Sequence, residues 1–232
     1  VFSKRKQPKD YTPEDFKQFL ENYKSNYIPT PAPERNDHKD LVDIELSLSD
    51  FHLAKRYVDG DNDPGTRAVR FINVAQKLID KVKSVYDINR VVFPISNDFF
   101  HTDNYQNQTT NGTPQDVFFD REEGLVKATV IGNTFIGFHH GNCKIEALPL
   151  LFATHPKYSK WFGDSTYREV HTGDKHHYMA KEIKGVRIQQ MPSLSGTDRW
   201  HKDNNFVHSV RAALALVYDF KVGKVAEFEE RI

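Results

Sequence analysis

The residues Leu46-Ser47-Leu48-Ser49-Asp50-Phe51-His52-Leu53 set the expectation for the whole chain. They complete an apolar run that begins at Leu41, and a short run of this kind predicts a buried β-strand. At its C-terminal end this strand delivers Asp50 and His52. Open α/β sheets place their functional groups beyond the C-terminal ends of strands, and both carboxylate and imidazole bind divalent metals. An isolated Asp-x-His pair is a weak indication, so the rest of the chain decides its meaning.

The composition is that of a globular protein with a sizeable core. Of the 232 residues, 38% are hydrophobic and 28% are charged, and the formal net charge is zero. A neutral chain has no overall positive field for nucleic acid, so such a contact would depend on a local basic patch. Cys143 is the single cysteine, which excludes an intrachain disulfide and favours a reducing, cytoplasmic compartment. No run has the length of a transmembrane helix and no signal peptide is recognised, so no membrane contact is expected.

Residues 1–38 are expected to form an N-terminal arm. Thr12-Pro13-Glu14-Asp15 predicts a helix start, because threonine is a good N-cap and proline suits the first turn. Aromatic and apolar residues then recur at helical spacing up to Tyr27. This stripe predicts a helix that packs on the main domain, on a protein partner or on a second copy, with nucleic acid as the alternative contact. A proline-rich linker follows, and the main domain is expected over residues 39–232.

The main domain is expected to start with a strand, a helix and a second strand. Apolar residues recur at helical spacing from Val69 to Val85 and predict a long amphipathic helix. Residues 90–96 predict the second strand, which should pair in parallel with the first. Further strands are expected at 126–131, 134–138, 167–170, 185–190, 212–219 and 225–228, with a helix at 146–153.

Pairs of ligand-type residues follow four of these strands. Four pairs at equivalent places are hard to attribute to chance. Carboxylates and imidazoles without thiolates argue against a structural zinc site and favour a two-metal hydrolytic centre. In such a centre two ions roughly 3.5–4 Å apart activate a water for attack on a phosphate. The pairs are Asp50/His52, Asp98/His101, His139/His140 and Asp174/His176.

The order of these motifs resembles that of the calcineurin-like metallophosphoesterase superfamily. The strings Asp-x-His, Asn-Asp-Phe-Phe-His, His-Gly and Gly-Asp-x-His run through residues 41–228. Asp98-Phe-Phe-His101 is also similar to a motif of double-strand-break-repair exonucleases. The resemblance implies an α/β fold, an αββα sandwich of two mixed β-sheets packed face to face and flanked by helices, after the N-terminal helical arm. Strings similar to a phage and prophage branch are Asn97–Asn104, Thr110–Asp116, His171–His177 and Pro192–His201.

The resemblance also implies the metal ligands. Asp50 and His52 would bind the first metal, His176 would return to it, and Asp98 would bridge the two ions. The cofactors would be two divalent ions, with Mn favoured and Mg, Fe, Zn or Ni as alternatives.

A second group of residues would complete the centre. His140 would bind the second metal, and Asp174 stands where the family has a histidine; a carboxylate can replace imidazole on a hard metal. His101 would be the catalytic residue that touches the scissile phosphate, or it would order Asp98. Residues that would lie around the ligands or contact substrate are Asn97, His139 and His177.

The main departure from the family is the absence of a Gly-Asn-His-Asp/Glu box. In the family this box supplies an asparagine ligand and a catalytic histidine. It would be expected between Asp116 and Val126, where about ten residues are too few for a strand-helix unit. We expect that a segment is omitted there, because losing a central strand would expose core and a sheet edge.

The resemblance implies a metal-dependent phosphodiesterase of nuclease type acting on DNA, encoded by a phage or prophage in a bacterial host. Lys55, Arg56 and Lys175 are candidate phosphate contacts. One alternative is a small-molecule phosphatase or cyclic-nucleotide phosphodiesterase. The other is a non-catalytic binding module that keeps a degenerate metal site.

Overall fold

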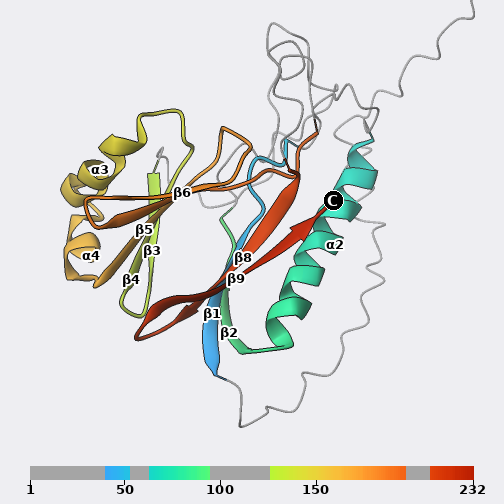
Figure 1. Ribbon diagram of the computed structural model, residues 1–232, viewed down its shortest axis with the longest axis horizontal. Coiled ribbons are helices and arrows are strands. Elements are labelled where there is room, and N and C mark those ends of the chain that lie inside the picture. Colours follow the sequence, from blue (N-terminus) through green and yellow to red (C-terminus); the bar gives the residue numbers. More distant parts are fainter. Residues whose placement is uncertain (1–39, 53–62, 95–125, 197–209) are drawn as a thin grey trace, which may run out of the picture.

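The computed structural model describes residues 40–52, 63–94, 126–196 and 210–232. Within these ranges nine strands form two mixed β-sheets, and helices cover the outer face of each (Figure 1). The predicted αββα sandwich is therefore confirmed. The N-terminal arm, the interval before Val126 and three of the candidate site residues, Asn97, Asp98 and His101, lie outside the described residues.

The first sheet has the strand order β2-β1-β8-β9. Strands β1 and β2 are parallel, as predicted, and β8 runs antiparallel to both β1 and β9. The bounds are β1 (Leu41–Ser47), β2 (Asp87–Val92), β8 (Ala212–Asp219) and β9 (Gly223–Arg231).

The second sheet has the order β3-β4-β5-β7-β6. Its three central strands are parallel, and the two edge strands are antiparallel to their neighbours. The bounds are β3 (Val126–Ile131), β4 (Thr134–His139), β5 (Tyr167–Thr172), β6 (Met179–Ile183) and β7 (Val186–Gln190).

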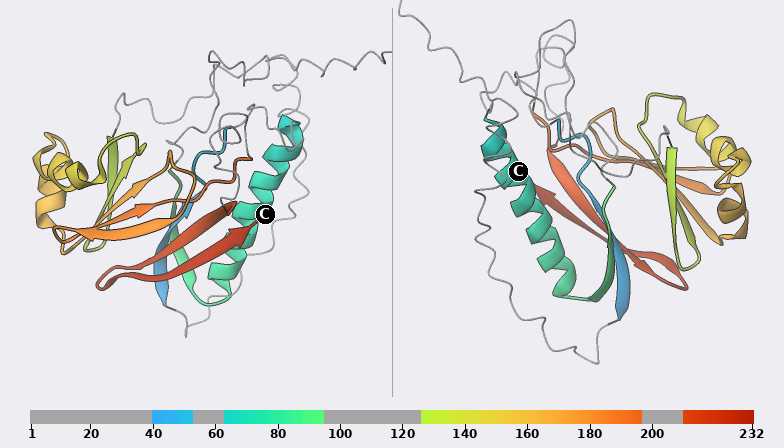
Figure 2. Two further views of the ribbon diagram at one scale, coloured as in Figure 1. Left: turned by 45° about the horizontal axis from the view of Figure 1, so that its top comes forward. Right: turned by 180° about the vertical axis from the view of Figure 1, so that it is seen from behind.

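Helix α2 (Pro64–Lys83) covers the first sheet. Its start is well defined, because Asp63 caps it by accepting the backbone N–H of Thr66 at 2.7 Å and Pro64 occupies the first turn. Lys81 and Lys83 lie in the last turn, where positive charge suits the helix dipole. A 3₁₀ turn η1 (Ile145–Ala147) and the short helices α3 (Leu148–Thr154) and α4 (Ser159–Asp164) cover the second sheet. The two further views in Figure 2 show the same four layers.

Strand β1 is buried on both faces, and its side chains alternate between two environments. Val42, Ile44 and Leu46 pack with the apolar face of α2. Glu45, between them, points to the second sheet, where it contacts His171 of β5. The core between the sheets is apolar elsewhere and contains Ile131, Ile136, Phe138, Met191, Leu214, Leu216 and Tyr218.

Two details of the sequence-based prediction are wrong. The second strand spans Asp87–Val92 rather than residues 90–96, because it pairs with β1 from Leu41↔Asp87 to Glu45↔Val92. Pro94, which has no N–H to donate to a ladder, lies beyond its end. Strand β6 and helix α4 were not predicted, since they have only five and six residues and are too short for a recognisable period.

No helix among the described residues is long and apolar enough to cross a lipid bilayer.

Candidate metal centre

The candidate ligands lie in three loops that follow parallel strands. Asp50 and His52 follow β1, His140 follows β4, and Asp174 and His176 follow β5. The loops contact one another through the backbone, since the Gly173 N–H donates to the His140 carbonyl at 2.9 Å. The structure thus brings together five residues that lie up to 126 positions apart in the sequence.

The first group of candidate ligands is buried. His52 and His176 face each other with 3.4 Å between their Nε2 atoms, and His176 Nε2 lies 4.0 Å from Asp50 Oδ2. Asp50 is fully buried, and both histidines are less than a tenth exposed. A carboxylate and two imidazole nitrogens are donor types that divalent ions bind.

A second pair lies beside the first group. His140 Nε2 is 3.6 Å from Asp174 Oδ1, and both side chains are 26% exposed. The backbone N–H of Asp174 donates to Asp50 Oδ2 at 2.7 Å, which joins the pair to the first group. Asp174 therefore lies beside His140, where the resemblance predicts that both residues bind the second metal.

The backbone is strained at the candidate ligands. Asp50, His52, Asp174 and His176 have φ between 48° and 68°, in the left-handed region that side chains rarely adopt. In the described part of the chain the one other non-glycine residue of this kind is Lys184, in the turn between β6 and β7. Strain of this kind costs of order 1–3 kcal/mol per residue and is common at ligand-binding sites, so it supports the prediction that these loops bind a ligand.

Gly173 is required for the loops to approach each other. A Cβ at this position would lie 2.5 Å from Asp50 Oδ2, closer than any side chain allows. Gly141 has φ of 114°, and its Cβ would lie 2.6 Å from the Gly173 carbonyl. The two glycines therefore let the β4 and β5 loops close over Asp50.

Two serines lie on the Nδ1 side of the His176 ring. Ser195 Oγ lies 3.2 Å from His176 Nδ1, and Ser193 Oγ lies 2.9 Å from Ser195 Oγ and 2.8 Å from the Asp50 carbonyl. A hydroxyl has one proton, so when Ser193 donates it to this carbonyl, Ser195 Oγ is able to accept the Nδ1–H of His176. That tautomer leaves the Nε2 lone pair, which faces His52 and Asp50, for a metal.

Replacing Ser195 by alanine is expected to lower the affinity for Mn²⁺ by about 10–100-fold, because Nδ1 loses the partner that fixes its tautomer. The measurement is calorimetric titration of the metal-free protein. Ser165→Ala, which removes an equally buried hydroxyl on the far side of the second sheet, is the matched control. Metal affinity equal to that of the wild type in Ser195→Ala would contradict this role.

The donor set fits divalent metals, but one candidate ligand lies outside the described residues. Asp98 would have to bridge two ions. Among the residues that the structure describes, no three His, Cys, Asp or Glu side chains are placed to hold an ion together. That the two groups above belong to one centre, connected by Asp98, stays a prediction.

The neighbouring histidines differ in their surroundings. His139 is buried, its Nδ1 accepts the backbone N–H of Gly141 at 3.0 Å, and burial, followed by the charge of His140, lowers its pKa. The lowered pKa favours the neutral form of His139, which precedes the candidate ligand His140. His177 is exposed, and its Nδ1 lies 3.0 Å from the Lys175 carbonyl. Burial raises the pKa of the Cys143 thiol, which is unfavourable for a nucleophile.

A buried ionic cluster lies between the sheets and joins β1, β5 and β8. His171 Nδ1 is 2.8 Å from Glu45 Oε2, and His171 Nε2 is 3.3 Å from Glu169 Oε2. Tyr218 donates its hydroxyl to Glu169 at 3.1 Å. Burial alone would lower the pKa of His171, but the charge of Glu45 and the hydrogen bonds to both carboxylates raise it to about 9. His171 is therefore a cation that links β5 to β1. Its position in the chain alone had placed it in the loop motif His171–His177.

Stability is expected to fall at alkaline pH because of His171. Its pKa is raised from 6.5 to about 9 in the folded state, so its contribution is fully present below about 6.5 and is lost as the pH rises through about 9. The loss is about 3 kcal/mol, since each pKa unit corresponds to about 1.4 kcal/mol. Urea unfolding from pH 6 to 10 measures it. A wild-type free energy of unfolding that does not change between pH 6 and 10 would contradict the raised pKa of His171.

No known family model matches the chain, and no curated protein is significantly similar to it. Several solved structures are similar in fold. A Vps29 from Entamoeba histolytica complexed with Zn²⁺ is 17% identical, with a TM-score of 0.36 over 82% of this chain and 98% of that one. A conserved protein from Streptococcus pneumoniae, described as a predicted phosphoesterase, is 14% identical, with a TM-score of 0.36 over 81% and 97% of the two chains. Vps29 from Chaetomium thermophilum, complexed with a cyclic peptide, is 11% identical, with a TM-score of 0.40 over 82% and 96%. Likenesses this distant assign neither a family nor an activity, which must be argued from the residues.

Proposed function

We propose that the chain is a calcineurin-like metallophosphoesterase, a dinuclear-metal-dependent phosphodiesterase of nuclease type that acts on DNA. The observation that carries this proposal is the meeting of two ligand groups in strained loops. Asp50, His52 and His176 form one group, and His140 and Asp174 form the other. The Asp174 N–H joins them at Asp50. The resemblance to phage and prophage proteins further suggests a cytoplasmic role in a bacterial host.

Each group would serve one ion. Asp50, His52 and His176 would hold the first metal, His140 and Asp174 would hold the second, and Asp98 would bridge them. Two ions bound together lower the pKa of a water and stabilise the charge that develops on the phosphate. The Asp174 N–H fixes the orientation of the Asp50 carboxylate, and Ser195 orients His176. His101 would contact the scissile phosphate. Manganese is the favoured metal because carboxylate and imidazole ligands are mixed.

The test compares substrates after metal removal. The protein is treated with EDTA, dialysed and assayed with Mn²⁺ on bis-p-nitrophenyl phosphate, on p-nitrophenyl phosphate and on linear DNA. The proposal expects Mn-dependent turnover of the diester in excess of the monoester, together with cleavage of DNA. Turnover of the monoester alone would contradict the nuclease proposal and favour a small-molecule phosphatase.

A non-catalytic binding module is the second candidate. It is favoured by the carboxylate of Asp174 in the place of a histidine and by the missing Asn-His box. This alternative expects no Mn-dependent turnover of any phosphoester. It also expects that Asp98→Ala leaves binding to a protein partner intact.

A further inference from the structure

The candidate centre is divided between two layers of the fold. Asp50 and His52 lie in the loop that follows β1 of the first sheet, whereas Asp174 and His176 lie in the loop that follows β5 of the second. The contacts among them cross from one layer to the other, since His52 Nε2 lies 3.4 Å from His176 Nε2 and the Asp174 N–H donates to Asp50 Oδ2 at 2.7 Å. The geometry of the centre therefore depends on how the two sheets lie against each other.

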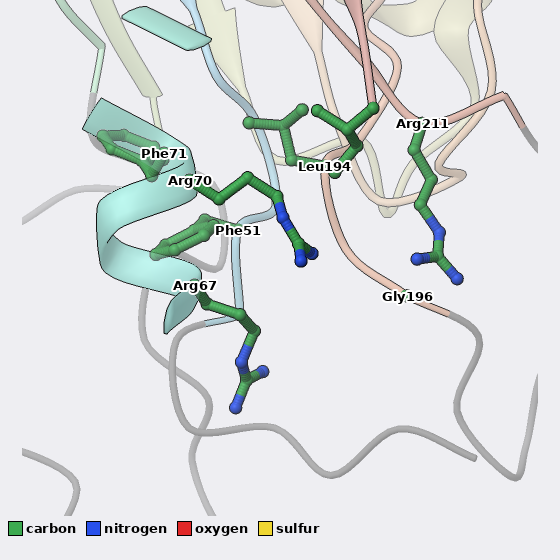
Figure 3. Close-up of a pocket in the computed structure, with 8 residues that line it drawn as sticks. Phe51, Arg67, Arg70, Phe71, Leu194, Gly196 and Arg211 are labelled. Atoms are coloured by element: carbon green, nitrogen blue, oxygen red, sulfur yellow. The ribbon is translucent and has the colours of Figure 1, made fainter. Parts of the chain in front are cut away.

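The β1 loop is held by the helix of its own layer. Phe51 packs against Phe71 of α2, with 4.6 Å between the ring centroids (Figure 3). Arg67, also on α2, is 3% exposed and donates from Nη1 to the His52 carbonyl at 3.4 Å. These contacts fix the loop relative to α2. Its position relative to the β5 loop depends on contacts that cross between the sheets.

One ion pair joins β1 and β5 across the space between the sheets. His171 Nδ1 lies 2.8 Å from Glu45 Oε2 and 2.9 Å from Glu45 Oε1, and neither side chain is more than 2% exposed. Glu45 precedes Asp50 by five residues, and His171 precedes Asp174 by three. At about 3.3 Å per residue, the pair lies within about 17 Å of Asp50 and about 10 Å of Asp174 along the chain.

The His171 ring is also held on its other side. Its Nε2 lies 3.3 Å from Glu169 Oε2, and Tyr218 donates its hydroxyl to the same oxygen at 3.1 Å. These contacts orient the ring so that Nδ1 faces Glu45.

Stability alone does not explain a buried ion pair at this place. Apolar residues of similar volume often stabilise a core as well or better. Apolar packing, which fills most of the space between the sheets, has no preferred direction. A hydrogen-bonded pair has one, because donor and acceptor must meet at a set distance and angle. The pair is therefore suited to hold β1 and β5 in one relative position.

We propose that Glu45 and His171 are positioning residues for the candidate metal centre, because their ion pair fixes β1 against β5 and so sets the approach of Asp174 to Asp50. This inference rests on the proposed function. Both residues would act on the metal only through the loops that follow their strands. Loss of the pair would separate the Asp174 N–H from the Asp50 carboxylate without removing any candidate ligand.

The first measurement is hydrogen exchange of the Asp174 amide, followed by NMR in the metal-free protein. In His171→Leu this exchange is expected to become about tenfold faster, the equivalent of one hydrogen bond to a charged group. The matched control is Leu78→Ala, because Leu78 is fully buried and packs with the face of β1 that is turned away from Glu45. It also costs stability but keeps the ion pair, so the Asp174 amide should exchange as in the wild type.

A second pair of variants separates position from stability. Both His171→Asn and His171→Gln lose the charge, but asparagine places its amide donor where Nδ1 faces Glu45, whereas glutamine places it where Nε2 faces Glu169. Slower exchange at Asp174 and tighter Mn²⁺ binding are therefore expected in His171→Asn than in His171→Gln. In calorimetric titration, His171→Gln should bind Mn²⁺ about tenfold more weakly than the wild type, and Leu78→Ala should bind it equally well.

Wild-type exchange at Asp174 in both His171→Leu and His171→Gln, or an equal acceleration in Leu78→Ala, would overturn the positioning role. The exchange is measured without metal, so this failure is distinct from that of the proposed function. The proposed function fails when the wild type neither binds Mn²⁺ nor turns over bis-p-nitrophenyl phosphate with it.

Discussion

Replacement of His171 by leucine is expected to lower the free energy of unfolding by about 3–5 kcal/mol, the cost of removing one partner from a buried ion pair. His171 is 2% exposed and lies between Glu45 and Glu169. Leucine would leave both carboxylates buried without their shared cation. In a domain of this size the melting temperature is expected to fall by about 10 °C. Thermal and urea unfolding at pH 7 measure the change.

The matched control is His155→Leu, because this half-buried histidine stacks on Tyr158 outside the second sheet and contacts no carboxylate among the described residues. Glu45→Gln in the His171→Leu background removes one of the two stranded charges and is expected to recover part of the loss. A change below about 1 kcal/mol in His171→Leu would show that the cluster does not join the sheets as described, since surface substitutions give changes of that order.

Replacement of Asp50 by asparagine is expected to abolish Mn-dependent hydrolysis and to weaken metal binding by at least about 100-fold, beyond the loss typical of a supporting residue. Asp50 is the carboxylate that approaches His176 and accepts the Asp174 N–H. Asparagine keeps an oxygen that is able to accept this N–H, so the loops should stay in place while the negative charge is lost. Mn²⁺ titration and turnover of bis-p-nitrophenyl phosphate are the measurements.

Asp164→Asn is the control for Asp50→Asn, since Asp164 is an exposed carboxylate that pairs with Lys160 on α4. It should bind metal and turn over substrate like the wild type. Metal binding in Asp50→Asn that equals the wild type would remove Asp50 from the centre. A loss of cooperative unfolding in the same variant would instead assign the residue a structural role.

The layers of the fold could be predicted from the sequence because the patterns are strong. The apolar run from Leu41 has the length of a buried strand, and the helical spacing between Val69 and Val82 is continuous. The hairpin around Gly132 also follows from local turn chemistry, and φ there is positive as such a turn requires. Strand β6 was missed because the five-residue edge strand Met-Ala-Lys-Glu-Ile has no alternation of apolar and polar residues.

Less of the site could be predicted, because its contacts join distant parts of the chain. Asp50, His52, His140, Asp174 and His176 were proposed as ligands from motif order, and the structure brings these five together. The support from Ser193 and Ser195 was missed, since a pair of serines in a loop has no distinctive pattern. The partner of His171 is Glu45, 126 positions away, which no local spacing indicates. The roles of Asp98, His101 and Asn97 stay predictions.

The most direct test of the proposed centre is the anomalous scattering of crystals grown with Mn²⁺. The account predicts two peaks within about 4 Å of each other. One should lie between Asp50, His52 and His176, and the other beside His140 and Asp174, with the Asp98 carboxylate between the two peaks. A single peak elsewhere, or no peak at these residues in crystals with saturating Mn²⁺, would contradict the two-metal centre.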